Sequence, residues 1–565
     1  MKEYIVNILE DVINGKLKRE EIEGLIEIPP QQEMGDFAFP CFSLAKIEKK
    51  SPLAIAQDLV EKIRKNLSKE VSGVELKSAY VNFFVDKKFL ADKVLKEATK
   101  KEYGLNKKTD SKKVVIDYSC PNAGKPMHIG HIRSTIIGDS MYKLATINGD
   151  NPIGINYLGD IGLHIGKLIV AWDLWLDKKQ LKENPTKELL RLYVEFCKNE
   201  KSEIKEGNEE DEYANNEWTI KAREKLKLIE DGDKEANEIW EEIKKASIEG
   251  FNKVYKKLDI HFDEITGQSK FTEEGKKVVS DGIASGVFKQ DETGAAYAEF
   301  GEHKKYVLRN NGTAFYMTQD LGSAISRSKK YKFDKMIYVT DYRQNLHFQQ
   351  LFEILGRLGF KFSKNCEHIG FGTINFGSEI MATREGKVIL LEDVIDRVTE
   401  KVKEQNKMRS SDVDPLKISI AALKYAILRI EPARDVEFSW DRALEFEGNT
   451  GPYLLYSYAR ASSILRKVKK TKTKLEIFDL SKEENALLIK LQTFPDIVKK
   501  AYESLSPNLV ANYAFELAQM FNEFYHANTV IGSREEAFRL KLIEAFRNVL
   551  KSSLNLLGIQ ELEEM

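Results

Sequence analysis

The clearest pattern of hydrophobic positions begins after Lys113. Residues 114–118 form a short, largely apolar and β-branched run, and a turn rich in Pro, Asn and Gly follows it. The chain then places apolar residues at one-face helical spacing, at Ile132, Ile136, Ile137, Met141 and Leu144. This order predicts a strand, a loop and a helix that packs against a sheet, as in the first unit of a doubly wound domain.

Similar apolar runs recur further along the chain, at residues 153–157, 335–340 and 369–374, and each is followed by helical spacing. A doubly wound parallel sheet of the Rossmann-like kind is therefore predicted for a central domain over residues 111–400. Between about residues 177 and 263 the sequence is dense in Lys and Glu with helical spacing. This stretch is predicted to be a helical insertion, with large apolar anchors at Trp218, Trp240 and Phe251.

The two ends of the chain follow other patterns. Residues 1–110 alternate amphipathic stretches with a central extended segment, which predicts a small α/β domain. From about Ala421 to Met565 the helical spacing continues without a strand pattern, which predicts an all-α bundle in a domain over residues 401–565. The expected fold class is thus α/β multidomain.

Length and composition support this division. A chain of 565 residues is too long for one core, and 42% apolar with 31% charged residues is typical of globular proteins. Charges recur every few positions at the N-terminus, and no stretch approaches about 18 apolar residues, so we expect a cytoplasmic protein without membrane contact. Four Cys without C-x-x-C spacing argue against a structural metal or a disulfide framework.

The net charge of −1 excludes a protein that coats nucleic acid by bulk positive charge. Local basic stretches remain. Residues 87–113 hold ten Lys against four acids, which fits a solvated helix face as well as an RNA-phosphate patch. A second stretch contains seven cations and no acid, namely Arg460, Arg466, Lys467, Lys469, Lys470, Lys472 and Lys474.

His128 and His131 stand where the loop after the first central strand becomes a helix. Helix N-terminal N–H groups favour phosphate, and Gly130 lets a nucleotide approach the backbone closely. Two imidazoles add donors that can stabilise charge on a pentacovalent phosphorus, which is an electrostatic role. Taken alone, two histidines that pack a turn fit this pattern equally well, so the flanking residues decide.

Those flanking residues resemble the signature of class I aminoacyl-tRNA synthetases, specifically of the arginyl-tRNA synthetase family. Residues 33–40 are similar to that family's appended N-terminal domain, residues 156–162 to its second catalytic strand and loop, and residues 448–453 to the start of its anticodon-binding bundle. The signature region consists of Pro121, Asn122, Ala123, Gly124, Lys125, Pro126, Met127, His128, Ile129, Gly130 and His131. The resemblance implies that residues 1–110 bind tRNA and that residues 401–565 bind the anticodon.

Class I enzymes carry a second signature, Lys-Met-Ser-Lys-Ser, whose lysines clamp the ATP phosphates. The corresponding stretch here, residues 380–384, holds neither lysine. The resemblance implies that Lys125 replaces the missing charge, and a flexible ammonium is a suitable point charge for phosphate. The expected ATP-binding residues are Lys125, His128, Gly130, His131, Met381 and Arg384, with Lys387 as a further candidate helper.

Recognition of the amino acid needs its own residues, because all class I members share the fold and the ATP chemistry. An arginine side chain presents five donors, so its pocket needs a carboxylate and neutral acceptors. Tyr316 and Asp320 are four apart and share a face if their segment is helical. The resemblance assigns arginine binding to these two and Gln344, and places Asn122 and Asp117 near the main-chain groups of the amino acid.

Three further features bear on the sites. His164 stands where the family usually has glutamine, and residues 267–269 read Gly-Gln-Ser where Gly-Glu-Ser is usual. In the C-terminal region, unpaired anticodon bases would need aromatic platforms. The tyrosines at 453, 456, 458 and 525 fit either such platforms or the core of the bundle.

These observations predict an enzyme that joins L-arginine to an arginine-accepting tRNA through arginyl-adenylate, with ATP and Mg²⁺ as the nucleotide complex. The resemblance further implies that the first step needs bound tRNA, and it favours a monomer. Two alternatives remain open. A catalytically inactive tRNA-binding paralogue fits the altered second signature, whereas a small-molecule nucleotidyltransferase leaves the two flanking domains unexplained.

Overall fold

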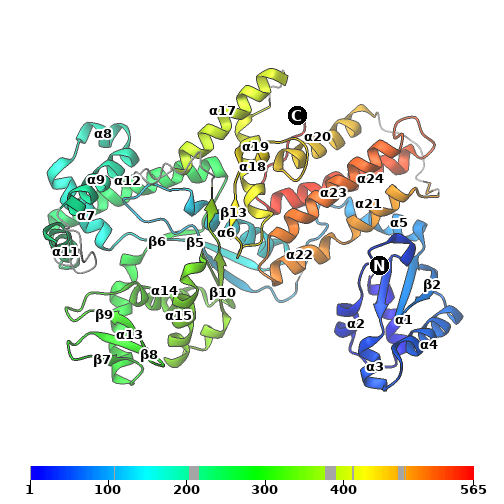
Figure 1. Ribbon diagram of the computed structural model, residues 1–565, viewed down its shortest axis with the longest axis horizontal. Helices are drawn as coiled ribbons and strands as arrows, with labels where there is room; N and C mark the ends of the chain where they lie inside the picture. The colour runs from blue at the N-terminus through cyan, green and yellow to red at the C-terminus, as the bar shows by residue number, and fades with distance from the viewer. Residues whose placement is uncertain are drawn as a thin grey trace.

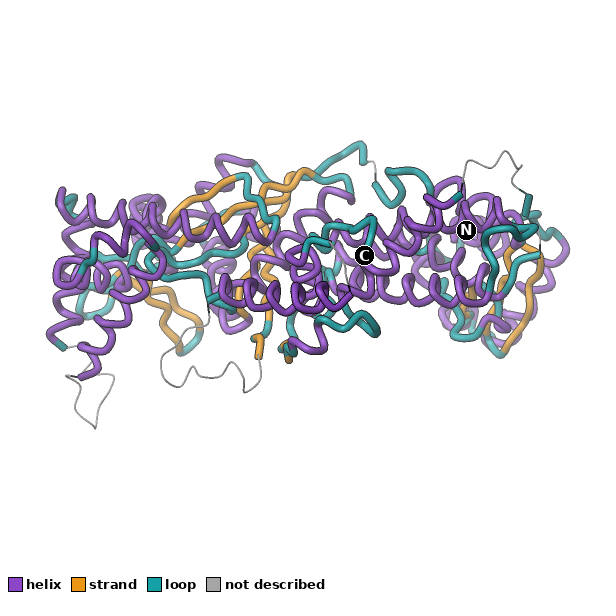
Figure 2. Tube along the Cα trace, turned by 90° about the horizontal axis from the view of Figure 1, so that it is seen from above, coloured by secondary structure: helices purple, strands orange, loops and turns teal. Residues whose placement is uncertain are grey.

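The computed structural model describes residues 2–106, 108–202, 216–375, 390–409, 413–468, 476–477 and 479–565. The molecule is elongated, with the N-terminal domain and the helical insertion at opposite ends of the long axis (Figures 1 and 2). The central sheet and the C-terminal helices lie between these ends. None of the helices in the described ranges combines the length and the apolar run that crossing a bilayer requires.

The N-terminal part is a small α/β domain, as its pattern predicts. Its antiparallel sheet has the order β1, β3, β2, and the strands are β1 Phe37–Pro40, β2 Val71–Lys77 and β3 Tyr80–Val85. Its helices are α1 Lys2–Ile13, α2 Arg19–Leu25, η1 Gln32–Met34, α3 Phe42–Glu48, α4 Pro52–Lys65 and α5 Lys87–Ala98. Helix α5 joins this domain to the C-terminal bundle, since the Asn548 side chain donates to the Ala98 carbonyl at 2.7 Å.

The central domain contains the predicted parallel sheet, with five strands in the order β6-β5-β4-β10-β11. The strands are β4 Lys113–Asp117, β5 Asn151–Leu158, β6 Glu264–Gly267, β10 Lys335–Asp341 and β11 Cys366–Phe371. Numbered by their order along the chain, the strands lie 3-2-1-4-5 across the sheet, which is a doubly wound order. Strands β5 and β6 are added on one side of β4, and β10 and β11 on the other, so the order switches between β4 and β10. The crevice at the carboxyl ends of these two strands is where such folds bind ligands.

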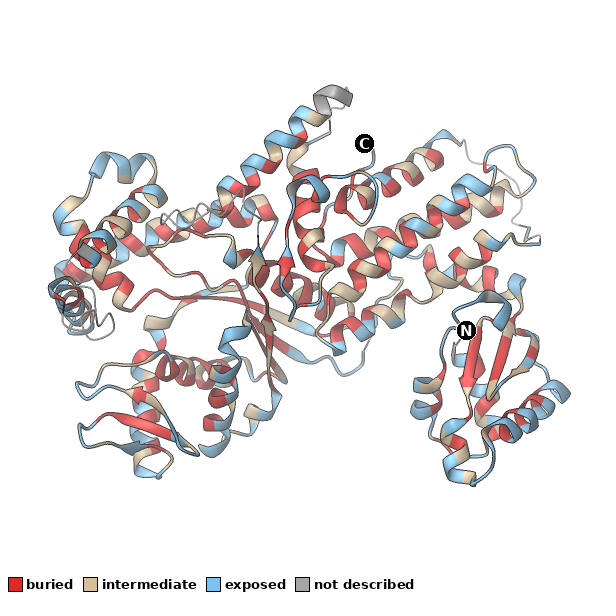
Figure 3. Ribbon diagram, in the orientation of Figure 1, coloured by how far each residue is buried: buried red, intermediate tan, exposed pale blue. Residues whose placement is uncertain are grey.

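Alternate residues of β4 pack into different cores, as expected for a strand covered on both faces. Val114 and Ile116 join the core that contains Ile132 and Ile136 of helix α6, Gly130–Ile147. Val115 joins the second core, which helices α14, Tyr316–Tyr331, and α15, Asn345–Arg357, help to form. The inner strands β4, β5 and β10 are mostly buried, whereas the edge strands β6 and β11 are partly exposed (Figure 3).

The remaining elements of the central region connect and extend the sheet. The insertion is helical, as predicted, with α8 Lys178–Glu183, α9 Pro185–Ser202, α11 Glu217–Glu230 and α12 Lys234–Leu258. Other helices are α7 Leu163–Trp175, η2 Gln268–Phe271, α13 Thr272–Ala284, η3 Tyr342–Gln344, η4 Lys361–Asn365 and α17 Leu391–Arg409. A small antiparallel sheet that the sequence pattern did not predict contains β7 Lys289–Gln290, β8 Ala296–Phe300 and β9 His303–Leu308.

The C-terminal region is a helical bundle, consisting of α18 Pro415–Leu428, α19 Trp440–Ala443, α20 Gly451–Lys467, α21 Lys482–Gln492, α22 Phe494–Glu503, α23 Asn508–Ala527 and α24 Glu536–Leu556. The expectation that no strand follows Ala421 is wrong at one place. Strand β13, Val436–Glu437, pairs in parallel with β12, Ile374–Asn375. Two residues are too few to produce an alternating pattern, so the sequence gives no sign of this pairing.

The end of the bundle is attached to helix α6 of the central domain. Ser140 Oγ donates to the Leu556 carbonyl at 2.8 Å, and Lys424 Nζ donates to the Gly558 carbonyl at 2.7 Å. The Lys424 ammonium is fully buried and lies 4.0 Å from a carboxylate oxygen of Asp139. Burial lowers the pKa of Lys424 to about 8. The end of α24 and the residues after it therefore help to support α6, the helix that begins at the signature histidines.

Candidate active site

The signature loop leaves β4 in a strained conformation. Ser119 and Cys120 have φ values of 76° and 47°, a left-handed region that side chains with Cβ atoms seldom adopt. The surrounding structure holds this conformation, because the N–H of Ser119 donates to Ser134 Oγ at 2.8 Å and that of Cys120 to Asn156 Oδ1 at 3.2 Å. Strain of this kind is concentrated at functional sites.

The next part of the loop lies against the segment after β5. The N–H of Ala123 donates to the Gly159 carbonyl at 3.0 Å, and the N–H of Gly159 donates to the Pro121 carbonyl at 3.1 Å. A Cβ on Gly159 would lie 2.0 Å from Oδ1 of Asn122, so a larger residue there would displace the Asn122 side chain. The insertion also contributes, since Ser247 Oγ accepts the N–H of Gly124 at 2.7 Å. Residues 121–124 of the signature thus form one loop that hydrogen bonds to neighbouring segments hold in place.

The two histidine rings lie close together at the start of α6, with centroids 4.0 Å apart and planes tilted by 42°. The N–H of Gly130 donates to Nδ1 of His128, and the N–H of His128 donates to Nδ1 of His131, both at 3.1 Å. Each neutral ring therefore carries its proton on Nε2. Burial and the nearby positive charge of Lys125 lower the pKa of His128, and burial is the main cause that lowers the pKa of His131 to about 3. Both rings are neutral N–H donors near pH 7.

Lys125 is half-buried, and its ammonium lies 4.5 Å from the ring centroid of Tyr193 on α9. This distance is within the range of a cation–π contact. Burial lowers the pKa of Lys125. The insertion therefore supplies an aromatic surface that orients this lysine, which the sequence alone did not reveal.

Met381, Thr383, Arg384 and Lys387 lie outside the described residues. The described residues on either side of them are attached close to the signature loop. Leu390 pairs with His128, and the N–H of Leu391 donates to the Met127 carbonyl at 2.9 Å. On the other side, β12 pairs with β13, near the Arg434 carbonyl that accepts from Arg133 of α6 at 2.6 Å.

The predicted pair Tyr316 and Asp320 lies in the first turns of α14, so the helical assignment on which their shared face depends is confirmed. Tyr316 is 55% exposed, whereas the Asp320 carboxylate is largely buried. Nε2 of His347 lies 2.7 Å from Oδ2 of Asp320. Gln344 ends η3 one helical turn before His347 and is exposed. Asp320 on α14 and Gln344 on η3 thus lie on two elements that the contact between Asp320 and His347 joins.

Asp117 ends β4 and is already engaged by the protein. Its Oδ2 accepts from Arg327 Nη1 at 2.6 Å, and its Oδ1 accepts the weak thiol donor of Cys120 at 2.9 Å. Both members of the ion pair are buried. Burial acts against the charge of Arg327, but the Asp117 carboxylate outweighs it and raises the pKa of the guanidinium. The residue predicted to lie near the substrate's main-chain groups is therefore held by an internal arginine.

One of the two departures from the family pattern, His164, has a local explanation, whereas Ser269 stands beside the second departure, Gln268, and is itself usual for the family. His164 Nε2 lies 3.0 Å from the Gly159 carbonyl, and burial lowers the pKa of this histidine to about 4. Ser269 donates to both carboxylate oxygens of Asp160, from its N–H at 2.9 Å and from its Oγ at 2.7 Å. Both residues thus brace the segment after β5. Within the described ranges, no three His, Cys, Asp or Glu side chains gather as a metal-binding group.

Three family models match the chain in consecutive ranges. Residues 1–85 match the arginyl tRNA synthetase N terminal domain, residues 93–440 match the catalytic domain of class I tRNA synthetases (R), and residues 454–565 match the DALR anticodon binding domain.

The chain belongs to the arginyl-tRNA synthetase family.

Other members of the arginyl-tRNA synthetase family match this chain over nearly its whole length. It is 41% identical to the arginine–tRNA ligase of Clostridium perfringens, over 97% of each chain. It is 38% identical to that of Clostridioides difficile, over 100% of this chain and 99% of the relative. The fold is similar to the arginyl-tRNA synthetases of Thermus thermophilus, with a TM-score of 0.81, and Plasmodium falciparum, with a TM-score of 0.80, each at 22% identity and covering 100% of this chain and 99% of the other.

The helical bundle of this family member, which matches the DALR anticodon binding domain, presents aromatic side chains on its surface. Tyr456 and Tyr525 are 38% and 37% exposed, and the guanidinium carbon of Arg460 lies 4.7 and 5.4 Å from their ring centroids. By contrast, Tyr458 is buried in the core, and Tyr453 packs on Phe515. Only Tyr456 and Tyr525 of the four tyrosines are thus both exposed and in contact with an arginine.

Within the predicted basic stretch after Arg460, the structure pairs Arg466 with acidic side chains. Arg466 lies 3.8 Å from Glu563 and 3.1 Å from Glu564, so acids distant in sequence offset its charge. Lys469, Lys470, Lys472 and Lys474 lie outside the described residues. Counting Arg466 as a free cation of this stretch therefore overstated the positive charge that it offers to RNA.

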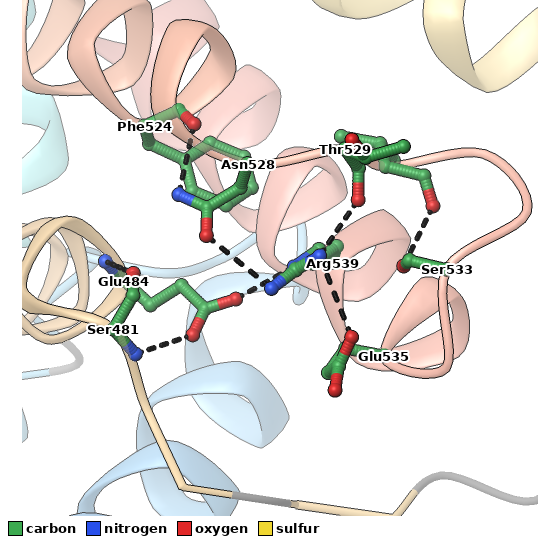
Figure 4. A network of polar contacts seen from close by, with 9 residues as sticks. Ser481, Glu484, Phe524, Asn528, Thr529, Ser533, Glu535 and Arg539 are labelled. Atoms are coloured by element: carbon green, nitrogen blue, oxygen red, sulfur yellow. Dashed lines mark hydrogen bonds and ion pairs between the residues drawn. The ribbon is translucent and has the colours of Figure 1, made fainter.

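A network of polar contacts fixes the turn that follows α23, the helix that carries Tyr525 (Figure 4). The buried Glu484 of α21 accepts from the Ser481 N–H at 2.7 Å and from Arg539 Nε at 2.8 Å. Arg539 also donates to the Thr529 carbonyl at 2.7 Å. These contacts attach α21, the turn and α24 to one another, and so hold the end of α23 in place.

Sequence reasoning missed three residues at this site, namely Tyr193, Arg327 and His347. Arg327 follows Asp320 by seven positions, which places both on one face of α14, and His347 follows Gln344 by three. Helical spacing therefore offered a signal for Arg327. Tyr193 contacts Lys125 across 68 positions of sequence, and no local pattern records such a contact.

Proposed function

We propose that this chain joins arginine to tRNA in two steps, in the crevice at the carboxyl ends of β4 and β10. The observation that carries this proposal is the pair of neutral histidines whose Nδ1 atoms accept backbone N–H groups at the start of α6. Their Nε2–H groups are fixed donors at a helix N-terminus, where a phosphate is favoured. The activity is that of the family to which the chain belongs.

In the first step the arginine carboxylate attacks the α-phosphate of ATP, which gives arginyl-adenylate and pyrophosphate. His128 and His131 donate hydrogen bonds to the charge that develops on phosphorus. Lys125 supplies the point charge that the second signature lacks, and Gly130 leaves room for the nucleotide. The Mg²⁺ that accompanies ATP would neutralise its outer phosphates. Met381 and Arg384 complete our proposed ATP-binding set.

Arginine binds with its guanidinium at Asp320, and the hydroxyl of Tyr316 and the amide of Gln344 complete the acceptors. The carboxylate of Asp320 supplies the charge, and its hydrogen bond with His347 fixes its direction. Asn122 and Oδ1 of Asp117 serve the main-chain groups of the substrate. We assign these roles because a planar cation with five donors needs acceptors that are held in place before it arrives.

In the second step the 2′-hydroxyl of the terminal adenosine of tRNA attacks the carbonyl carbon of arginyl-adenylate, which gives arginyl-tRNA and releases AMP. We propose that residues 401–565 bind the anticodon, that residues 1–110 contact another part of the same tRNA, and that residues 111–400 carry the chemistry. The exposed pair Tyr456 and Tyr525 with Arg460 supplies stacking surfaces for unpaired bases. The working form is a monomer in the cytoplasm.

ATP–pyrophosphate exchange with arginine, measured with and without tRNA, tests this proposal. We expect exchange that depends on both arginine and tRNA. Asp320→Asn should weaken arginine by about 2 to 4 kcal/mol, because a buried cation loses its partner, but should weaken citrulline little. Asp281→Asn, on the exposed side of α13, is the matched control. A chain that binds tRNA without any exchange would instead be the inactive paralogue.

A further inference from the structure

The buried ion pair beneath the proposed arginine pocket is only partly satisfied. Arg327 is 2% exposed, and Nη1 donates to Asp117 at 2.6 Å. Its Nε and Nη2 atoms have no hydrogen-bond partner among the described residues. Buried guanidinium groups that serve only the fold normally have their donors satisfied. The incomplete bonding of Arg327 therefore calls for a role beyond packing.

Two tyrosines, from the strands on either side of β4, lie near this guanidinium. The carbon at its centre lies 4.7 Å from the ring centroid of Tyr157 on β5. Tyr338 of β10 stands opposite Asp117 in the strand register, and its hydroxyl acts electrostatically on Arg327. The hydroxyl of Tyr338 is buried and has no hydrogen-bond partner within the part of the chain that the structure describes, and the buried hydroxyl of Tyr157 lies near Ser323. Arg327 thus lies in a polar compartment, with unused donors and acceptors on several sides.

This compartment adjoins the proposed substrate pocket. Residues 316, 320 and 327 share one face of α14, which runs from the exposed Tyr316 through Asp320 to the buried Arg327. Asp320 is also close enough for its charge to act on Asp117. Two carboxylates and one guanidinium therefore form a single electrostatic group with a net charge of −1. Free arginine carries a net charge of +1 at neutral pH and balances this group.

We propose that Arg327 is a specificity-determining positioning residue, which neutralises Asp117 and leaves Asp320 as the one uncompensated carboxylate for one substrate guanidinium. This inference rests on the proposed function, because it concerns the same pocket. Arg327 fixes the orientation of Asp117, so that Oδ1 faces away from the ion pair. It also occupies the place where a second guanidinium would otherwise be attracted.

Removing this side chain should open a guanidinium-sized space beside an unpaired carboxylate. In Arg327→Ala we expect the KM for arginine to rise by about tenfold or more, because Asp117 loses its partner and its orientation. Methylguanidinium at millimolar concentration should restore part of the lost activity. In the wild-type chain the same ion finds that space filled, and we expect it to inhibit by competing with arginine at Asp320.

The decisive measurement is the rate of arginine-dependent ATP–pyrophosphate exchange, with tRNA present, as methylguanidinium is titrated into the wild type and Arg327→Ala. Stimulation of the variant together with inhibition of the wild type supports the inference. Inhibition of both to the same extent, or an unchanged KM in Arg327→Ala, overturns it. If the wild type shows no arginine-dependent exchange, the proposed function itself fails, which is a distinguishable result.

Arg327→Lys keeps the experiment informative if Arg327→Ala does not fold. Lysine retains the charge but lacks the planar fork, so it should fold and neutralise Asp117 without fixing its direction. We expect a KM for arginine between those of the wild type and Arg327→Ala, with a smaller change in kcat. If Arg327→Lys has the wild-type KM for arginine and responds to methylguanidinium as the wild type does, orientation by Arg327 is not needed. That result would overturn the inference.

Discussion

Nε2 of His347 lies 2.7 Å from Oδ2 of Asp320, and this contact joins the start of α15 to the first turns of α14. The histidine ring is itself held edge-on to Phe348, at 5.4 Å between ring centroids. With its proton on Nε2, the His347 ring donates to the carboxylate and so restricts the rotation of the Asp320 side chain. The acceptor that we assign to the substrate is therefore oriented before the substrate arrives.

Loss of this contact should weaken arginine binding. In His347→Ala we expect the KM for arginine to rise by about tenfold, since a hydrogen bond to a charged group contributes about 1.5 to 3 kcal/mol. His347→Gln retains an N–H donor and should lose less. Steady-state exchange kinetics measure both values, with the exposed His303→Ala on β9 as the control. An unchanged KM in His347→Ala would show that Asp320 needs no such support.

The signature histidine next to the nucleotide should act as a donor and not as an acid or base. We expect His131→Ala to lower the rate of adenylate formation by about two to three powers of ten, with little change in the KM for arginine. Because the pKa of His131 is lowered to about 3, its titration should be absent from the rate profile between about pH 6 and pH 9. A near-normal rate in the variant would remove the assigned role.

The aromatic surface from the insertion should affect catalysis through Lys125. We expect Tyr193→Leu to lower the adenylation rate by about threefold to thirtyfold, the range of a cation–π contact that is partly desolvated. Tyr193→Phe keeps the ring and should behave like the wild type. Single-turnover formation of arginyl-adenylate measures this difference. Equal rates in the two variants would mean that the ring does not orient the lysine.

The exposed tyrosines of the bundle should contribute to tRNA affinity alone. Tyr525→Ala should weaken tRNA binding by about 1 to 3 kcal/mol, the usual contribution of one stacked base. Tyr525→Phe, which retains the stacking surface, is the matched variant and should bind normally. Filter binding at fixed salt provides the dissociation constants. If neither variant changes tRNA affinity, the anticodon lies elsewhere on the bundle.

Stability should fall as the solution becomes acidic, and His164 should account for part of the loss. Its pKa is about 4 in the folded chain and about 6.5 when unfolded, so between these values only the unfolded state binds the proton. Its contribution is therefore lost as the pH falls through 6.5, by about 2 kcal/mol at about pH 5. Urea unfolding at two pH values should show a smaller difference in His164→Gln. The same pH dependence in both proteins would place the titrating groups elsewhere.

Several elements of the fold could be predicted from the sequence because burial leaves a record in the apolar positions, as a continuous run in a strand covered on both faces and as one-face spacing in a helix. The run at 114–118 and the spacing from Ile132 to Leu144 predicted β4 and α6, and the four-residue interval predicted that Tyr316 and Asp320 share a face. Strand β6, Glu264–Gly267, gave no such record, because it is short and mixed in polarity at the edge of the sheet.

The partners of the site residues could not be predicted in the same way. Periodicity reports which side of an element is buried, but not which distant side chain it meets. The pairs Asp117 with Arg327 and Lys125 with Tyr193 join residues 210 and 68 positions apart. Arg466 likewise pairs with acids near position 563, which a count of charges along one stretch does not include. The positions assigned from the second signature lie outside the described residues.

The hydrogen bond from Ser140 of helix α6 to the Leu556 carbonyl has a consequence for the exchange of domains between relatives. A hybrid that takes its helical bundle from another member of the family also takes that member's residues after α24. The end of the new bundle must supply a carbonyl acceptor to Ser140, and its counterparts of Lys424 and Gly558, which move together, must still meet Asp139, or the first catalytic helix loses part of its support. Compatibility at these few atoms, more than general similarity of the bundles, should decide which hybrids remain active.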